Sequence, residues 1–384
     1  MKNVGIICEY NPLHGGHKYM IETLRAMGAE RIICIMSGNS VQRGDLAIIP
    51  KNRRALSAIE AGADAVFELP FPYSMGSAEF FALAGVDILN RLGVDTVAFG
   101  SETGDVSKLR EIAERSELLI PSGNKSIGTA EEYFAALGKD FDPNDILGIE
   151  YLKAGKKLAP NLEFVTVKRE GAGYHDDSVG GAYPSATELR CAISDGELDK
   201  YNESQLPPES RRSIEAAAAE GEIAYLKNIE GAILSFWRLC DAEKVSECAE
   251  CGGGVAQRIM SAARASGSLG HMTSLMATKR YTDSRLRRAL IFGMTGVKRS
   301  DLRERAAYVN LLAANEKGLE FLSDVKDIEV LSKPSRIPDS VRSIRQFTLG
   351  QRLESLYTLA MISPRESGIF LRQSPQIVKN DKKF

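Results

Sequence analysis

The stretch EYNPLHGGHKYM, residues 9–20, holds two of the four histidines in the 384-residue sequence. His14 and His17 are three positions apart and flank two glycines. Glycine has no Cβ atom, so the backbone N–H groups of such a turn can approach a phosphate closely. Imidazoles there can donate hydrogen bonds to charge that develops on the phosphate, and the loss of one such donor typically costs about 2.7–4 kcal/mol. The stretch therefore predicts a site for nucleotidyl transfer.

Two other interpretations of this stretch are weaker. Two surface histidines on a glycine-rich turn would have no catalytic role. A metal site would need a third ligand at a suitable spacing, and the neighbouring sequence offers none. We therefore predict no metal ligands in the protein.

A second pattern, YPSATELRCAI, begins at residue 183. Ser185 is a typical helix N-cap, and Thr187 and Arg190 follow it. The free N–H groups at a helix start, together with a guanidinium, can bind the β- and γ-phosphates of a nucleotide. Taken alone, the pattern also fits an ordinary helix cap with a surface arginine.

Strands and helices alternate in the first half of the sequence. Helical periodicity extends over residues 17–27, 51–62, 76–92 and 105–116. The alternation predicts a parallel sheet with helices on its faces, which binds ligands at the carboxyl ends of its strands. The histidine stretch follows the first strand directly. The runs that predict buried strands are residues 3–10, 31–38, 64–70, 95–102 and 162–169.

The sequence becomes mainly helical after about residue 200. Pro207 and Pro208 indicate a linker, and residues 306–322 and 340–362 are among the segments that we predict to be helical. We therefore expect an α/β protein of two domains. A Rossmann-like nucleotidyltransferase domain with a parallel sheet would span residues 1–200, and a mainly α-helical RNA-binding domain would span residues 201–384.

The two motifs, in this order, resemble the signature of the nucleotidyltransferase superfamily, which includes class I aminoacyl-tRNA synthetases and small adenylyltransferases. A closer resemblance, to the bacterial tRNA(Met) cytidine acetate ligase family, covers most of the chain. Gly15 stands where that family usually has Asn. The blocks that carry this resemblance are EYNPLHGGH, MSGNSVQRGDLAI, FGSE, ILGIEYLKA, VKREGAGYHD, SATELR and TKRYTDSRLRRALI.

This resemblance implies a reaction in two steps. ATP and acetate would form acetyl-adenylate and release pyrophosphate, and the acetyl group would then pass to the wobble cytidine of elongator tRNA(Met). Mg²⁺ is expected on the phosphates. The first step needs no general base, because acetate is already ionised. In the second step an amine must lose a proton, and His175 and Asp176 are candidate acceptors.

The resemblance also implies which residues form the ATP site. His14 and His17 would stabilise the transferring phosphate, and Arg190 would hold the outgoing pyrophosphate with Ser185 and Thr187. We count the two histidines and Arg190 as catalytic. The complete ATP-binding set is Ile7, Cys8, Glu9, Tyr10, Asn11, Pro12, Leu13, His14, Gly15, Gly16, His17, Lys18, Tyr19, Met20, Gly100, Asn144, Arg169, Ser185, Thr187 and Arg190.

Residues 251–300 form a basic stretch, with nine Lys or Arg against one acid, whereas residues 201–250 hold ten acids and five bases. A local basic stretch is typical of contacts with nucleic-acid phosphates, although a solvated helix face gives the same pattern. Tyr281 could stack on an exposed base. Because of the resemblance we favour RNA binding, and the candidate residues are Lys279, Arg280, Arg285, Arg287 and Arg288.

Composition indicates a globular cytoplasmic protein, with 43% apolar and 26% charged residues and a net charge of −2. No apolar run approaches the roughly 20 residues of a membrane span, and the N-terminal apolar segment does not resemble a signal peptide. We predict no membrane contact and no protein partner. Six cysteines are few for this length, which fits a reducing compartment. Cys248 and Cys251 form a lone C-x-x-C, too few ligands for zinc even though Cys240 and His271 are near in sequence.

Two other functions fit part of the sequence. A small-molecule adenylyltransferase would join AMP to a phosphorylated acceptor and would not need the basic half. An RNA-binding protein that keeps the nucleotide fold without turnover would release no pyrophosphate. The intact histidine and Ser-x-Thr-x-x-Arg motifs favour an enzyme over the second alternative.

Overall fold

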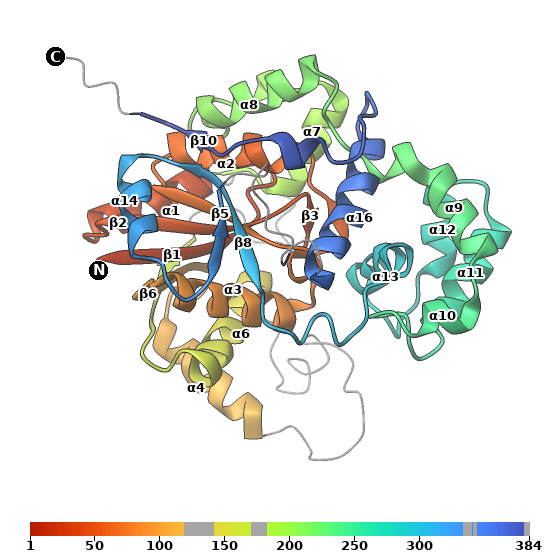
Figure 1. Ribbon diagram of the computed structural model, residues 1–384, viewed down its shortest axis with the longest axis horizontal. Coiled ribbons are helices and arrows are strands. Elements are labelled where there is room, and N and C mark those ends of the chain that lie inside the picture. The colour runs from red at the N-terminus through yellow and green to blue at the C-terminus, as the bar shows by residue number, and fades with distance from the viewer. Residues whose placement is uncertain (119–141, 170–182, 333–339, 341–343, 380–384) are drawn as a thin grey trace.

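The structure, a computed structural model, describes residues 1–118, 142–169, 183–332, 340 and 344–379. Its centre is an eight-stranded sheet in the order β10-β8-β5-β2-β1-β6-β7, with β9 paired to β8 (Figure 1). The strands from β5 to β7 in that order are parallel, and β8 is antiparallel to β5. The α/β fold with a mostly parallel sheet is therefore confirmed. The strands of the sheet are β1 (Asn3–Cys8), β2 (Arg31–Ser37), β5 (Ala65–Leu69), β6 (Thr96–Ser101), β7 (Glu163–Lys168), β8 (Tyr308–Ala314), β9 (Glu329–Leu331) and β10 (Gln376–Ile377).

The five predicted strands and four predicted helices of the first half are all present to within a few residues. A two-stranded hairpin, β3 (Ser40–Val41) and β4 (Asp45–Leu46), follows β2. The α-helices in the described ranges are α1 (Gly15–Ala26), α2 (Lys51–Glu60), α3 (Ala78–Leu92), α4 (Val106–Leu118), α6 (Pro143–Leu158), α7 (Ala186–Asp195), α8 (Pro208–Ala219), α9 (Glu230–Leu239), α10 (Ala242–Ser246), α11 (Val255–Ala265), α12 (Leu269–Met276), α13 (Asp283–Thr295), α14 (Glu316–Asp324) and α16 (Arg345–Ala360).

Different helices cover the two faces of the sheet, because successive side chains of a strand point to opposite faces. Ile6 and Cys34 lie in the core that α1 and α2 cover. Ile7 and Ile33, each one position away, lie in the core that α3 and α6 cover. Both faces of β1 and β2 are therefore buried, and only the strand ends remain for a site.

The prediction of helix over residues 306–322 is wrong for its first half. Tyr308–Ala314 forms β8, and the α14 helix begins after Asn315, whose side chain accepts a hydrogen bond from Gly318 N at 3.0 Å. A short run that is apolar on both faces has the same pattern as a buried helical segment. Part of the expected C-terminal helical domain therefore belongs to the sheet of the N-terminal one.

The C-terminal half is otherwise mainly helical, as predicted. Helices α9 to α13 share a core around Trp237 and Phe292, and Val41 and Leu46 of the hairpin belong to the same core. Figure 1 shows these helices beside the sheet, with α16 between the two parts. The proline pair expected in a linker instead begins α8, where Pro208 is the first helical residue. The helical layer and the hairpin are thus packed together through shared apolar residues.

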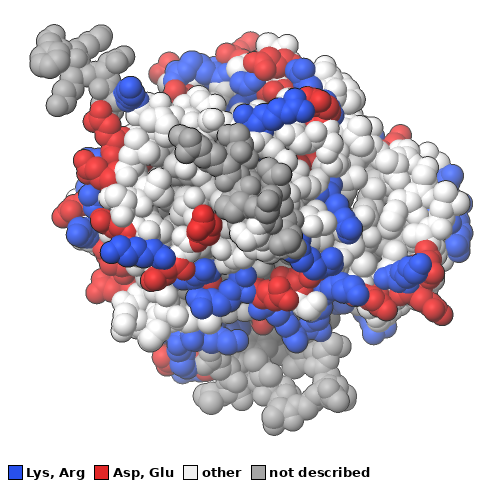
Figure 2. All heavy atoms as spheres, in the orientation of Figure 1, with Lys and Arg blue, Asp and Glu red and all other residues white. Residues whose placement is uncertain are grey.

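Charges of both signs are mixed over the surface. On the face shown in Figure 2, Lys and Arg side chains lie beside Asp and Glu over the part of the chain that is coloured by charge. This mixture agrees with the net charge of −2 for the whole chain. In the described ranges, no helix combines the length and the apolar character needed to cross a bilayer.

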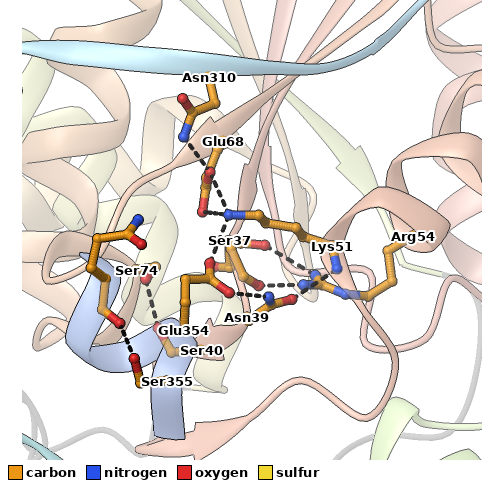
Figure 3. Close-up of polar contacts among 12 residues, drawn as sticks. Ser37, Asn39, Ser40, Lys51, Arg54, Glu68, Ser74, Asn310, Glu354 and Ser355 are labelled. Atoms are coloured by element: carbon orange, nitrogen blue, oxygen red, sulfur yellow. Dashed lines mark hydrogen bonds and ion pairs between the residues drawn. The ribbon is translucent and has the colours of Figure 1, made fainter. Parts of the chain in front are cut away.

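A buried polar cluster joins α16 and β8 to the first half of the chain (Figure 3). Lys51 Nζ lies 2.9 Å from Glu68 Oε1 and 2.7 Å from Glu354 Oε1. Asn39 donates to Glu354 Oε2 at 2.7 Å, and Asn310 donates to Glu68 Oε2 at 2.7 Å. Burial opposes the charge of Lys51, but Glu354 and Glu68 outweigh burial and raise the pKa of its ammonium. The two halves are therefore held together by paired, hydrogen-bonded charges.

Candidate nucleotide site

The histidine turn connects the carboxyl end of β1 to the start of α1. His14 is the N-cap of α1, and its Nδ1 accepts a hydrogen bond from Gly16 N at 3.2 Å. The Nδ1 atom of His17 accepts a hydrogen bond from His14 N at 3.2 Å, which completes a capping box. The two rings stack, with centroids 3.7 Å apart and planes 28° apart. The helix cap thus fixes the position of both imidazoles.

The capping box also assigns the tautomer of each ring. Both Nδ1 atoms act as acceptors, so each neutral ring carries its proton on Nε2. Burial, with a smaller effect of Arg169, lowers the pKa of His14 to about 3. Burial, His14 and Arg169 lower the pKa of His17 well below its ordinary value. At neutral pH both histidines are therefore uncharged and offer an Nε2–H donor.

These pKa shifts predict a loss of stability in mild acid. We expect the free energy of unfolding to fall below about pH 6.5, because the unfolded histidines take up protons that the folded state excludes. Each histidine contributes a slope of at most about 1.4 kcal/mol per pH unit, and the loss from His14 continues towards pH 3, where the folded form titrates. Urea unfolding between pH 7 and pH 5 measures the slope. His14→Asn keeps an N-cap residue and should lower the slope, and equal slopes in the two proteins would contradict this account.

Gly15 is required by a close approach of the backbone. Its N–H donates to the carbonyl oxygen of Gln205 at 2.9 Å. A Cβ atom at this position would overlap the carbonyl oxygen of Ser204 and crowd the ring of Tyr183. The segment around residue 204 therefore packs on the turn and leaves no room for a side chain at position 15.

The structure brings the Ser-x-Thr-x-x-Arg motif to the histidine turn. Ser185 caps α7, and its Oγ accepts a hydrogen bond from Glu188 N at 3.1 Å. Arg190 Nη1 donates to the carbonyl oxygen of Asn11 at 2.9 Å, and Nη2 donates to Thr187 Oγ1 at 2.9 Å. The starts of α1 and α7 therefore lie on the same side of the sheet, linked by Arg190.

A third group of the expected residues lies at the carboxyl ends of β6 and β7. Asn144 Nδ2 donates to Glu102 Oε1 at 2.5 Å, and Arg169 Nε lies 3.6 Å from the same oxygen. Gly100 is next to the side chain of Arg169, which would be 3.5 Å from a Cβ atom at that position. Arg169 also helps to lower the pKa of both histidines, so this group adjoins the histidine turn.

The remaining residues of the 7–20 segment support the turn from the interior. The side chain of Asn11 accepts a hydrogen bond from Ile48 N at 2.8 Å, and a cis peptide bond joins Asn11 to Pro12. Lys18 Nζ is paired with Glu209 at 3.0 Å. Several other side chains of the segment belong to the hydrophobic cores, namely those of Ile7, Cys8, Tyr10, Leu13, Tyr19 and Met20. Any contact of these residues with a nucleotide would therefore be made by their backbone atoms.

The β3–β4 hairpin is a part of the site that sequence reasoning missed. Gln42 N donates to Glu9 Oε1 at 2.8 Å. Asp45 lies 3.5 Å from Arg287. Burial lowers the pKa of Arg190, whereas the charges of Glu9 and Asp45 oppose this effect and favour the charged guanidinium. Gly44, with φ of +78°, allows the hairpin turn and marks it in the sequence. The hairpin therefore connects the histidine turn to α13.

The candidate RNA-binding residues differ in their burial and in their ion pairs. Arg288 is buried and lies 3.3 Å from Glu250, and Arg285 lies 3.1 Å from the same carboxylate. Both arginines are thus paired within the helical layer, and the buried Arg288 has little surface to offer to RNA. Arg287 is paired with Asp283 at 2.7 Å as well as with Asp45. Lys279 and Arg280, by contrast, are exposed.

The candidate proton acceptors, His175 and Asp176, lie outside the described residues.

The C-x-x-C pair can be described. Cys251 is buried, and its thiol donates to the carbonyl oxygen of Ala289 at 3.5 Å. Burial raises the pKa of that thiol, so it packs as a structural residue.

The fold and the paired motifs define the class of protein, a nucleotidyltransferase: residues 1–368 match the model of the HIGH Nucleotidyl Transferase family. The chain is 33% identical over 387 residues to the tRNA(Met) cytidine acetate ligase of Caldanaerobacter subterraneus subsp. tengcongensis, covering 94% of this chain and 96% of that relative. It is 33% identical to the Acetivibrio thermocellus protein of the same name, covering 89% and 90% of the two chains. The structure of Thermotoga maritima TmcAL bound with α-thio ATP matches with a TM-score of 0.86, at 26% identity and with 99% and 100% coverage. The chain belongs to the tRNA(Met) cytidine acetate ligase family.

Proposed function

We propose that the protein activates acetate with ATP and transfers the acetyl group to the wobble cytidine of elongator tRNA(Met). The observation that carries the proposal is the link from Arg190 to the histidine turn, which joins two phosphate-binding helix starts. The names of the relatives and the ATP analogue bound to the Thermotoga maritima protein agree with it. Because its substrate is a tRNA, we place the reaction in the cytoplasm.

In the first step, an acetate oxygen attacks the α-phosphorus and the bond from phosphorus to the pyrophosphate oxygen breaks. The Nε2–H donors of His14 and His17 would point at the α-phosphate oxygens, where negative charge increases in the transition state. Arg190 and the free N–H groups at the start of α7 would hold the departing pyrophosphate. Neutral histidines suit this role, since they stabilise charge without transferring a proton.

In the second step, the exocyclic amine of cytidine attacks the acetyl carbon, and the bond from that carbon to the AMP oxygen breaks. The amine nitrogen must lose a proton in this step. His175 and Asp176 remain the proposed acceptors. Enclosure of the adenylate would be needed to exclude water, because water competes with the amine for the acetyl group.

Mg²⁺ would reach the site on the phosphates of ATP. It is usually held by one or two carboxylates and by substrate oxygens rather than by a complete protein cage. Among the described residues, no three His, Cys, Asp or Glu side chains are grouped for a metal. Glu9 and Asp45, whose charges act on Arg190, are the residues proposed to hold it, a proposal that departs from the expectation of no metal ligands. Bound there, it would neutralise charge on the phosphates.

The hairpin gives the RNA a route to the adenylate. A Cβ atom on Gly44 would lie 2.5 Å from Arg288 N, so the hairpin packs directly on α13. The turn before α13 carries Lys279 and Arg280, and the Arg280 guanidinium lies 5.2 Å from the centre of the Tyr281 ring. We propose that this turn, with Arg287, contacts tRNA phosphates. An RNA held there lies next to the element that borders the nucleotide site.

ATP–pyrophosphate exchange tests the proposed function. Exchange should depend on acetate, either with the protein alone or after addition of elongator tRNA(Met), and labelled acetate should then enter the tRNA. Exchange that is absent under both conditions would contradict acetate activation. Exchange without transfer to tRNA would support a small-molecule acceptor instead.

Replacing Lys279 and Arg280 with Ala should weaken tRNA binding and leave acetate activation unchanged. The logarithm of the binding constant should depend less steeply on salt, by roughly 1.4–1.8 for two phosphate contacts. Filter binding between 50 and 200 mM salt measures this slope. Lys317→Ala with Lys326→Ala, exposed cations of α14 and the following loop, is the matched control. An equal loss in both double variants would contradict a specific contact.

A further inference from the structure

Glu102 has one carboxylate oxygen that is buried and has no hydrogen-bond partner among the described residues. Its Oε1 accepts from Asn144 Nδ2 at 2.5 Å and lies 3.6 Å from Arg169 Nε. Its Oε2 is buried and has no hydrogen-bond partner. The side chain as a whole is 20% exposed, so the oxygen is shielded although the residue borders the surface.

A buried carboxylate oxygen without a partner is expected to receive a hydrogen bond from a ligand. Leaving a buried polar group unsatisfied lowers stability, and more so when the group is charged. Native proteins keep few such groups, and those that remain are often found at functional sites. Burial raises the pKa of Glu102, whereas Asn144 and Arg169 oppose this effect, in agreement with a poorly solvated carboxylate.

The position of Glu102 points to a nucleotide as the source of that donor. Glu102 follows β6, and β6 is adjacent to β1, which leads to the histidine turn. The strand order reverses between these two strands, and open α/β sheets bind ligands at such a point. One of its two partners, Arg169, also acts on the pKa of His14 and His17, so Glu102 belongs to the group that adjoins the histidine turn.

The charge of Glu102 decides which part of the nucleotide it can meet. A carboxylate repels phosphate, and the phosphates have the helix starts of α1 and α7 and Arg190 on the other side of the site. The nucleoside is the part that carries neutral donors, on the ribose hydroxyls and on the exocyclic amine of adenine. Either group could donate the hydrogen bond that Glu102 Oε2 lacks.

We propose that Glu102 Oε2 accepts a hydrogen bond from the nucleoside of ATP, and that Glu102 thereby helps to select the nucleotide. The proposal rests on the proposed use of ATP by this site. Glu102 also orients Asn144 through Oε1. Its role in selection is a separate contact made by the second oxygen.

Glu102→Gln tests the contact with little change of shape. The Gln oxygen can still accept from Asn144, but an NH₂ donor then replaces the Oε2 acceptor. Calorimetric titration should show ATP binding roughly 10- to 100-fold weaker, the range for a hydrogen bond to a charged group. The titrations are repeated with 2′-deoxyATP, 3′-deoxyATP and purine riboside triphosphate, which lack one hydroxyl or the amine.

The analogue that lacks the true donor identifies the contact. It should bind the wild type more weakly than ATP does, and Glu102→Gln should cause little further loss with that analogue alone. The control is Glu163→Gln, an exposed residue at the opposite end of the neighbouring strand β7. An equal loss for all four nucleotides would show that Glu102 only positions Asn144 and Arg169, and would overturn the proposal. Unchanged ATP binding would overturn it as well.

Binding and turnover separate this proposal from the proposed function. The titration measures nucleotide binding without acetate or tRNA, so its result does not depend on the reaction. If the wild type binds ATP in a Glu102-dependent way but shows no acetate-dependent exchange, the ligase function fails and the nucleoside contact stands. If exchange is normal and the analogue pattern is absent, only the contact fails.

Discussion

Replacing His17 with Ala is expected to lower acetate-dependent ATP–pyrophosphate exchange about 100- to 1,000-fold, the typical effect of removing one donor to developing charge. The structure gives the reason. The capping box holds the ring with Nδ1 towards the backbone, and Nε2–H is left to donate to a ligand. The effect should fall mainly on the rate at saturating ATP, because charge on the α-phosphate oxygens increases in the transition state.

The control for His17→Ala is His271→Ala, an exposed histidine on α12. That variant should exchange at the wild-type rate. Circular dichroism must show that His17→Ala is folded at the assay temperature, since the substitution also removes half of the capping box. Exchange within tenfold of the wild type in the folded variant would contradict the donor role.

Lys51→Met is expected to lower the free energy of unfolding by about 3–5 kcal/mol, the usual cost of removing one partner of a buried ion pair. The substitution leaves Glu68 and Glu354 buried with no cation between them. Asn39 and Asn310 would still donate one hydrogen bond to each carboxylate. Urea unfolding at pH 7 measures the change.

Two comparisons make the Lys51 experiment specific. Lys200→Met removes the Lys200–Glu197 pair, whose side chains are about half exposed, and should cost much less than Lys51→Met because solvent screens such a pair. The loss in Lys51→Met should also shrink as the pH is lowered, because burial raises the pKa of Glu354 and protonation removes its buried charge. A loss no larger than that of the surface variant would contradict a stabilising role of the cluster.

The sequence was sufficient to predict the parallel part of the sheet and the helix starts at which the two motifs lie, since each depends on a local pattern. The strand β8 was missed because its side chains are apolar on both faces. Arg285 and Arg288 were interpreted as surface cations because their partner, Glu250, lies in the acidic segment that precedes the basic stretch. Glu102 was not selected because its significance comes from an oxygen left without a partner. Pairs of residues far apart in the sequence are not apparent from it, and an atom without a hydrogen-bond partner can be recognised only in the three-dimensional structure.

The position of β8 has a consequence for synthesis on the ribosome. Asn310 and Glu68, which meet in the buried cluster, are 242 residues apart in the chain. At the usual elongation rate of 5–20 residues per second, β5 is made roughly 12–50 s before β8. During this interval the edge of β5 that β8 will cover is open, and an open apolar edge is a template for intermolecular pairing. Nascent chains that stall before residue 308 therefore present an aggregation-prone edge, whereas chains that extend through β8 cover this edge with Tyr308–Ala314.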